Sequence, residues 1–523
     1  MKDARNTPSH HLADRLGRRD FLRLGGYGIT GAMLAGTSGC GVLSGGESSG
    51  GGGKAGSLTA AYGRSLDNLD PHGAFAAAEP TRLASEQIFD SLLGRVDGKI
   101  VPRLAAKWDN PHPKTWVFTL RDDVTFHDGS PLTARDVAAS IERQAKTDSP
   151  LADLWELLDR AQAEDDRTVV VQSKEPLGTV LANMTLMRVL PADKMDKPDF
   201  FQKPIGSGPY KVTQFAPGSQ LSLEANTHYW DGKPDTPRVV LRIVTEEASR
   251  ITGLETGETQ LTWPIPGDQL KRLEDSEDVT ILDTASYQYW FNWFNCSRKP
   301  FTDPDVRRAL WHAIDAKALA KNIFPGSAQV ARAPISSSVF GYAAQEPYAY
   351  DPKKAKSLLA KAGFPNGFST SVMWNQSQAP QIRQVAETMI SYWREIGVKV
   401  QPQELEEAQW TERLLALDWD MDLQTNVTAT GDADYSLGRL YLSSANRLGY
   451  KNPKLDKVLN AARQSQDQNK RKQLYSEACR IIWQEAPGIF PIEMRLNFAT
   501  RKNVRGFEAT PDESPSLRQV RLT

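Results

Sequence analysis

The residue types that usually perform catalysis form no local motif in this sequence. The histidines after residue 40 are widely spaced, at His72, His112, His127, His228 and His312. No two of them lie three to five positions apart, so the spacing of a helical zinc site is absent. A Gly-x-Ser-x-Gly motif is also absent. The sequence therefore predicts no catalytic residue, no metal site and no cofactor, although a hydrolase triad assembled from distant residues would leave no such motif.

A run of aromatic residues and asparagines, YQYWFNWFN (287–295), points to binding instead. Alternate residues of a strand face opposite ways, so both faces of this strand carry rings. Such a strand is either buried on both faces or lines a cavity with one. In a cleft, rings stack on a ligand and amides fix its orientation. The predicted cleft residues are Trp263, Tyr289, Trp290, Asn292, Trp374, Asn375 and Trp410. Core packing is the competing interpretation of each ring.

Two carboxylates in the segment 425–441, Asp432 and Asp434, are candidates to bind a cationic group of a ligand. Arg439 and Arg447 are nearby cations that could bind a carboxylate. A solvated turn is the competing interpretation of the two acids, because short charged runs usually lie on the surface.

The first forty residues are typical of an export signal. Residues 1–23 carry six basic and three acidic residues, and residues 24–39 carry no charge. Arg18 and Arg19 precede Phe-Leu, which resembles a bacterial twin-arginine signal; a general secretory signal is the alternative. Small residues before Cys40 resemble a lipoprotein cleavage site, so Cys40 is the predicted lipid attachment point.

The remaining chain has the composition of a folded, water-exposed protein. Residues 40–57 form a Gly/Ser-rich tether between the expected lipid anchor and the folded part. The whole chain has 523 residues, 40% of them hydrophobic, and a net charge of −1. This balance provides no basic surface for nucleic acid, and Cys296 and Cys479 either pair or lie buried separately.

Strands and helices alternate along the folded part. TWVFTL (115–120) alternates in the manner of a strand, and Thr133 with Asp136 is typical of a helix start. Asp303–Pro304 and Asp351–Pro352 begin two further helices. Strands interleaved with helices predict an α/β fold.

Seven sequence blocks in a fixed order resemble the family 5 extracellular solute-binding proteins, the dipeptide, oligopeptide and nickel receptors of ABC importers. The resemblance extends over residues 58–523. The blocks are 65–72, 115–141, 204–212, 228–234, 248–258, 294–315 and 350–368.

The resemblance implies a two-lobed periplasmic-binding-protein-like α/β fold of the cluster C type, with an extra subdomain in lobe I. Lobe I would span 58–286 with 497–523 returning to it, and lobe II would span 287–496. Two strands near 285–289 and 497–501 would cross between them. The implied function is capture of a peptide-like solute by a monomeric, lipid-anchored protein outside the cytoplasmic membrane, and delivery to an ABC permease.

The resemblance leaves the ligand open. In peptide-binding relatives an aspartate in the segment 425–441 binds the ligand's amine, and Ala429 stands at the matching position here. Asp432 or Asp434 could substitute for it. The alternatives are a non-peptide solute, such as an oligosaccharide, a metal chelate or an amino-acid conjugate, and a secreted hydrolase.

Overall fold

The computed structural model describes residues 56–96 and 98–523. The signal expected at 1–39, with Arg18 and Arg19, lies outside the described residues, as do Cys40 and most of the tether. Among the described residues, no helix has both the length and the apolar character needed to cross a membrane.

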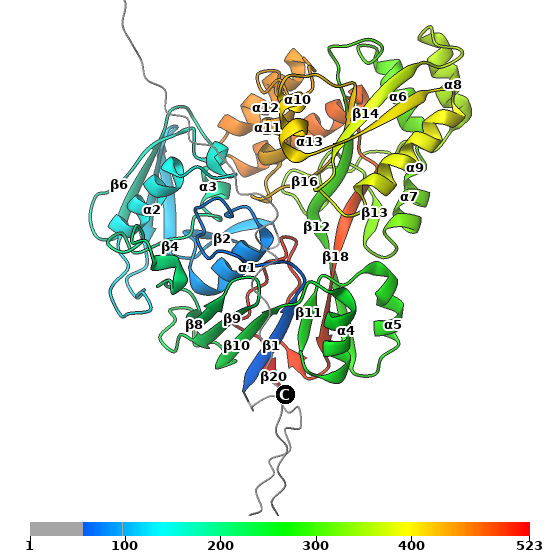
Figure 1. Ribbon diagram of the computed structural model, residues 1–523. Helices are drawn as coiled ribbons and strands as arrows, with labels where there is room; N and C mark the ends of the chain where they lie inside the picture. The colour runs from blue at the N-terminus through cyan, green and yellow to red at the C-terminus, as the bar shows by residue number, and fades with distance from the viewer. Residues whose placement is uncertain (1–55, 97) are drawn as a thin grey trace, which may run out of the picture. The chain divides into compact units, whose positions relative to one another are not determined.

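One large mixed sheet extends through both lobes (Figure 1). Its ten-strand path contains parallel and antiparallel pairs. In spatial order the strands are β15 (Lys399–Leu405), β14 (Ser369–Asn375), β16 (Met421–Val427), β12 (Val279–Phe294), β18 (Ile492–Arg501), β11 (Leu261–Trp263), β1 (Ser57–Tyr62), β10 (Arg238–Ile243), β9 (Gln220–Ala225) and β8 (Tyr210–Ala216). Two short strands, β13 (Ala328–Val330) and β17 (Gly488–Ile489), pair with β18 and β12.

The long strands β12 and β18 connect the two lobes. Residues 279–285 of β12 pair with β18, and residues 288–294 pair with β16. The β12–β18 register shifts between Ala285 and Tyr289, and the pairing of β12 with β16 on its other edge begins at Gln288. At its start β18 pairs with β13, and near its end it pairs with β11.

Three large clusters of buried side chains stabilise the fold. One joins residues 58–263 to the C-terminal residues 496–520, a second lies within 92–189, and the third contains only residues 287–492. The second cluster packs on a separate four-stranded sheet, in the order β4 (Ala105–His112), β5 (Thr115–Leu120), β7 (Thr168–Ser173) and β6 (Leu158–Ala163). The chain is thus a two-lobed α/β protein with an additional sheet in lobe I.

Local sequence explains several elements. Every second residue of β5 is buried, Trp116, Phe118 and Leu120, as its alternation predicts. The backbone N–H of Thr133 donates to the carboxylate of Asp136 at 2.9 Å, and α2 begins at the next residue.

The helices of the two lobes cover the sheets. Those of lobe I are α1 (Glu79–Ile88), α2 (Ala134–Lys146), α3 (Val180–Asn183), α4 (Glu247–Thr256) and α5 (Leu270–Glu274). Those of lobe II are α6 (Pro304–His312), α7 (Ala316–Ile323), α8 (Pro352–Lys361), α9 (Ile382–Glu395), α10 (Glu407–Leu415), α11 (Arg439–Tyr441), α12 (Pro453–Gln464) and α13 (Gln468–Glu485). Asp303 and Asp351 cap α6 and α8, as predicted.

Candidate functional site

The aromatic residues predicted to line a cleft lie inside the lobes. Trp263 is fully buried in lobe I, where its ring packs against Tyr62 and Phe498. Tyr289 and Trp290 lie on β12 in the core of lobe II, and the indole N–H of Trp290 is buried without a hydrogen-bond partner among the described residues.

The other predicted cleft residues of lobe II make contacts within that lobe. Asn292 is buried and donates to the carbonyl of Trp293 at 3.2 Å. Trp374 donates to Glu404 at 3.3 Å, and Asn375 accepts from the backbone of Ser377. Trp410 is half-buried and donates to Asp422 at 2.9 Å. The structure does not gather these side chains around one cavity.

The two predicted carboxylates do lie at cavities between the lobes. Asp432 and Asp434 line a space of about 450 Å³ between residues 153–183 and 430–463. Asp432 also lines a space of about 890 Å³ on the side of 337–342 and 466–472. Each carboxylate already has a cation: Arg471 binds Asp432 at 2.9 Å, and Arg463 binds Asp434 at 3.1 Å.

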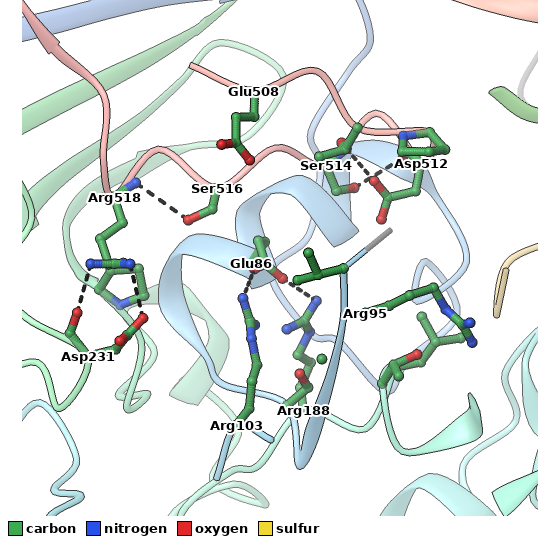
Figure 2. Close-up of a pocket in the computed structure, with 18 of the residues that line it drawn as sticks. Glu86, Arg95, Arg103, Arg188, Asp231, Glu508, Asp512, Ser514, Ser516 and Arg518 are labelled. Atoms are coloured by element: carbon green, nitrogen blue, oxygen red, sulfur yellow. Dashed lines mark hydrogen bonds and ion pairs between the residues drawn. The ribbon is translucent and has the colours of Figure 1, made fainter. Parts of the chain in front are cut away.

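A third cavity, of about 360 Å³, is lined by eight charged residues (Figure 2). We call it the charged cavity. Most of its wall belongs to lobe I, and lobe II contributes Tyr287, Ala429 and Thr430. Its charged lining residues are Glu86, Arg95, Arg103, Arg188, Asp231, Glu508, Asp512 and Arg518.

A carboxylate shared by two guanidinium groups forms part of the wall. Glu86 on α1 accepts from Arg103 at 2.5 Å and from Arg188 at 2.7 Å (Figure 2). Burial alone would raise the pKa of Glu86, but the two cations outweigh burial and lower it. The group of three therefore carries one net positive charge. The Nη1 of Arg188 is buried and has no hydrogen-bond partner among the described residues.

Arg95 connects the cavity wall to lobe II. It lies on β2 (Leu93–Val96), which pairs with β3 (Lys99–Pro102). Its guanidinium donates to the carbonyl oxygens of Gly98 at 3.0 Å and Thr430 at 2.9 Å. Among the described residues, no carboxylate forms an ion pair with Arg95, so its charge is balanced only by carbonyl dipoles.

The loop of lobe II reaches the cavity at Ala429 and Thr430, and Gly431 follows them. Gly431 has a φ of +61°, and a Cβ there would lie 2.6 Å from the hydroxyl of Tyr287. Burial raises the pKa of Tyr287 to about 12, so its hydroxyl stays protonated and can donate. Tyr287 also lies at the register shift between β12 and β18, which places one cavity residue on the crossing strand.

The C-terminal segment supplies the remaining wall. Seven alternate residues line the charged cavity: Gly506, Glu508, Thr510, Asp512, Ser514, Ser516 and Arg518. The intervening Phe507, Ala509 and Leu517 pack into the core of lobe I. The alternation is partial, because Pro511 and Gln519 also line the cavity and a turn at 511–513, with Glu513 at a φ of +59°, interrupts the segment. Arg518 is paired with Asp231 at 3.0 Å.

Two motifs singled out in the sequence have a structural role beside the cavity. The buried carboxylate of Asp90 accepts from Ser207 of the block 204–212 at 2.9 Å and from Tyr229 of the block 228–234 at 2.7 Å. The indole N–H of Trp230 donates to it as well, at 3.1 Å. Burial raises the pKa of Asp90. These bonds fix Pro209 and Tyr229 in the cavity wall.

The residues that give the charged cavity its charge are not marked by any local sequence pattern. Arg95, Arg188 and Glu508 are far apart in the chain and belong to no local motif. The alternation in 506–518 was a usable signal, but two prolines within it weaken the pattern of a strand.

Thiols and metal ligands add no further site in the part of the chain that the structure describes. Cys296 and Cys479 are free, and burial raises their pKa values to about 11 and about 12. Across residues 56–96 and 98–523, no three His, Cys, Asp or Glu side chains are grouped as metal ligands.

Comparison with known proteins relates the whole folded part to one group. The profile of the bacterial extracellular solute-binding proteins, family 5 Middle, matches residues 99–447. The glutathione-binding protein GsiB of Pectobacterium atrosepticum is 30% identical over 493 residues, covering 88% of this chain and 93% of that protein.

Solved structures show the same fold. HbpA2 from Haemophilus parasuis superposes with a TM-score of 0.82 at 25% identity, covering 89% of this chain and 100% of that chain. The periplasmic binding protein DppA from Helicobacter pylori, solved with the peptide STSA, has a TM-score of 0.74 at 26% identity and covers 90% and 98%.

Proposed function

This chain belongs to the bacterial extracellular solute-binding proteins of family 5, and we propose that it captures a peptide-like solute for an ABC importer. The solute would lie between the lobes in the charged cavity and pass from there to the permease. The observation that carries the proposal is the lining of that cavity, in which cationic groups with excess positive charge and carboxylates without an ion-pair partner among the described residues occur together, and to which both lobes contribute residues.

The charges of the cavity fit a short peptide with more than one carboxylate. After Arg518 pairs with Asp231, and Glu86 with its two arginines, the cavity retains two positive charges, one of them on Arg95. It also retains the carboxylates of Glu508 and Asp512. Glutathione, for which the relative from P. atrosepticum is named, carries one ammonium group and two carboxylates. We propose a ligand of that class.

Binding alone accounts for the site. A solute that contacts both lobes stabilises the closed arrangement by its differential affinity for that arrangement. We propose that lobe I consists of 58–286 and 497–523 and lobe II of 287–496, with the crossing strands β12 and β18 as the hinge. No reaction is required of the residues in the cavity.

The predicted cleft residues would then act in two ways. Asp432 and Asp434 would fix the loop that presents Thr430, since both are bound by arginines of lobe II. The other predicted residues would stabilise the two walls by packing inside each lobe. They are Trp263, Tyr289, Trp290, Asn292, Trp374, Asn375 and Trp410.

We further propose that Arg18 and Arg19 direct export, that Cys40 carries the lipid anchor, and that the protein is monomeric at the outer face of the membrane. Replacing Cys40 by Ser should move the protein from the membrane fraction to the soluble fraction or leave the signal uncleaved. Unchanged fractionation and processing would contradict the anchor.

Native mass spectrometry of the folded protein, followed by calorimetry, tests the ligand class. We expect co-purified or added glutathione, or another short peptide, to bind with one-to-one stoichiometry. A single non-peptide mass, or turnover of an added substrate, would overturn the peptide proposal.

A further inference from the structure

The polar face of the C-terminal segment contains two carboxylates that lack a cationic partner. Glu508 is exposed and Asp512 is half-buried, and neither forms an ion pair within residues 56–96 and 98–523. The carboxylate of Asp512 accepts only the backbone N–H of Ser514, at 3.2 Å, while Arg82 donates to the main-chain carbonyl of Asp512 and not to its carboxylate. Figure 2 shows both side chains extending from this segment toward the space that Glu86 and its two arginines also face.

The carboxylates of lobe II are unsuited to binding a ligand's ammonium group. Asp432 and its partner Arg471 are almost completely buried, with 3% and 1% of their side chains exposed. Asp434 is held by Arg463. An ammonium group would have to displace a guanidinium from either acid, and breaking a buried pair is costly. Ala429, which faces the charged cavity from the same loop, has no carboxylate at all.

The cationic groups are on a different part of the wall. The groups that keep a net positive charge, Arg95 and the Glu86–Arg103–Arg188 group, belong to α1, the β2–β3 hairpin and adjoining residues of lobe I. Arg518 of the C-terminal segment is neutralised by Asp231. A zwitterionic peptide gains most when its carboxylates face these arginines and its ammonium group faces the two free acids.

We propose that Glu508 and Asp512 bind the α-ammonium group of the solute, so that the C-terminal segment of lobe I, rather than the loop of lobe II, determines the orientation of the peptide. This inference rests on the proposed peptide-like ligand. It assigns the carboxylates of the solute to the side of Arg95 and Arg188.

The test compares two probes, glutathione and N-acetylglutathione, by isothermal titration calorimetry on ligand-free protein. Acetylation removes the ammonium charge. We expect the wild type to bind glutathione at least tenfold more tightly than the acetylated probe. The double variant Glu508→Gln/Asp512→Asn should bind the two probes with affinities within twofold of each other, because it lacks the carboxylates that would bind the ammonium group. Its affinity for N-acetylglutathione should match that of the wild type.

Two controls make the result specific. Glu346→Gln removes a carboxylate that is 97% exposed and does not line the cavity, and it should retain the tenfold preference. Asp434→Asn tests the acid of lobe II: because this residue positions the loop at the cavity, the affinity for both probes can fall, but their ratio should stay at least tenfold. Thermal melting verifies that the variants fold, and the single variants Glu508→Gln and Asp512→Asn should each lose part of the preference.

Failure of this inference and failure of the proposed peptide-like ligand give different results. A wild type that binds neither probe overturns the peptide-like ligand and this inference together. If the wild type binds glutathione and the double variant keeps the preference for it over N-acetylglutathione, the inference is wrong and the peptide-like ligand still holds. The same conclusion follows if Asp434→Asn loses the preference instead.

Discussion

The guanidinium of Arg471 on α13 donates to both carboxylate oxygens of Asp432, at 3.0 and 2.9 Å. The same arginine donates to the carbonyl of Ala462 and to the hydroxyl of Tyr475, both at 3.2 Å. This bidentate pair attaches the loop that carries Ala429 and Thr430 to the core of lobe II. The position of the cavity wall in lobe II therefore depends on a buried ion pair within that lobe.

Asp432→Asn should destabilise the protein by about 3–5 kcal/mol, because it leaves the charge of Arg471 buried without a counter-ion. Urea unfolding followed by circular dichroism measures the change. Lys271→Met removes one partner of a pair whose side chains are 85% and 68% exposed, and should change stability by less than about 1 kcal/mol. Equal effects of the two substitutions would contradict the structural role of Asp432.

The sequence predicted those parts of the fold that depend on local patterns. The alternation in β5, the capping pair Thr133 and Asp136, and the Asp-Pro starts of α6 and α8 all depend on neighbouring residues. The order of the resembling blocks predicted the two-lobed α/β fold. These signals specify elements and their order, and the structure confirms them.

The charged cavity could not be predicted in the same way, because its residues meet only through the topology. Arg95 reaches Thr430 across more than three hundred positions of sequence. The aromatic run on β12 was ambiguous for a physical reason. A central strand that is covered on both faces and a strand that lines a cleft can carry the same pattern of aromatic residues. Only the packing around the strand distinguishes the buried strand from the cleft wall.

Trp290→Ala distinguishes a core ring from a cleft ring. The side chain is 1% exposed and packs against Phe324 with ring centroids 5.3 Å apart. We expect a loss of about 3–5 kcal/mol in the free energy of unfolding, as for other buried aromatic residues. Trp290→Phe should cost much less, since it keeps a ring and removes an N–H that has no partner among the described residues. A stable Ala variant with weakened solute binding would instead place this ring in the binding site.

Asp422 predicts a pH-dependent contribution to stability. It is completely buried, and burial raises its pKa to about 7, although Trp410 and Gln424 donate to it. Below the pKa of Asp422 in the unfolded state, about 4, the carboxyl is protonated in both states, so its ionisation does not reduce the free energy of unfolding. Between pH 4 and 7 the folded state holds a proton that the unfolded state has released, so stability falls as the pH rises.

Asp422→Asn should remove that loss. The variant and the wild type should differ little at pH 4, and the variant should be the more stable by up to roughly 4 kcal/mol at pH 8. Denaturant unfolding at several pH values measures the difference between the two proteins, which cancels the titration of all other groups. A difference that does not change with pH would show that Asp422 titrates normally in the folded protein.

Gly178 forms a close backbone contact between the two lobes. Its N–H, in lobe I, donates to the carbonyl of Arg463 in lobe II at 2.7 Å. A Cβ at this position would lie 1.8 Å from the carbonyl oxygen of Ser465, so no residue with a side chain permits the contact. Gly178→Ala should therefore hold the lobes apart at this point without disturbing the core of either lobe.

Gly178→Ala should bind the solute at least tenfold more weakly than the wild type. With solute present, its radius of gyration by small-angle scattering should be larger than that of the wild type. The unfolding free energy of the ligand-free protein should not change. Gly253→Ala on α4 is the matched control, because a Cβ there meets nothing closer than 3.5 Å. Since a ligand shifts the open–closed balance only by its differential affinity for the closed form, blocking one closing contact lowers affinity directly. Wild-type affinity in Gly178→Ala would mean that the solute-bound form does not use the contact between Gly178 and Arg463.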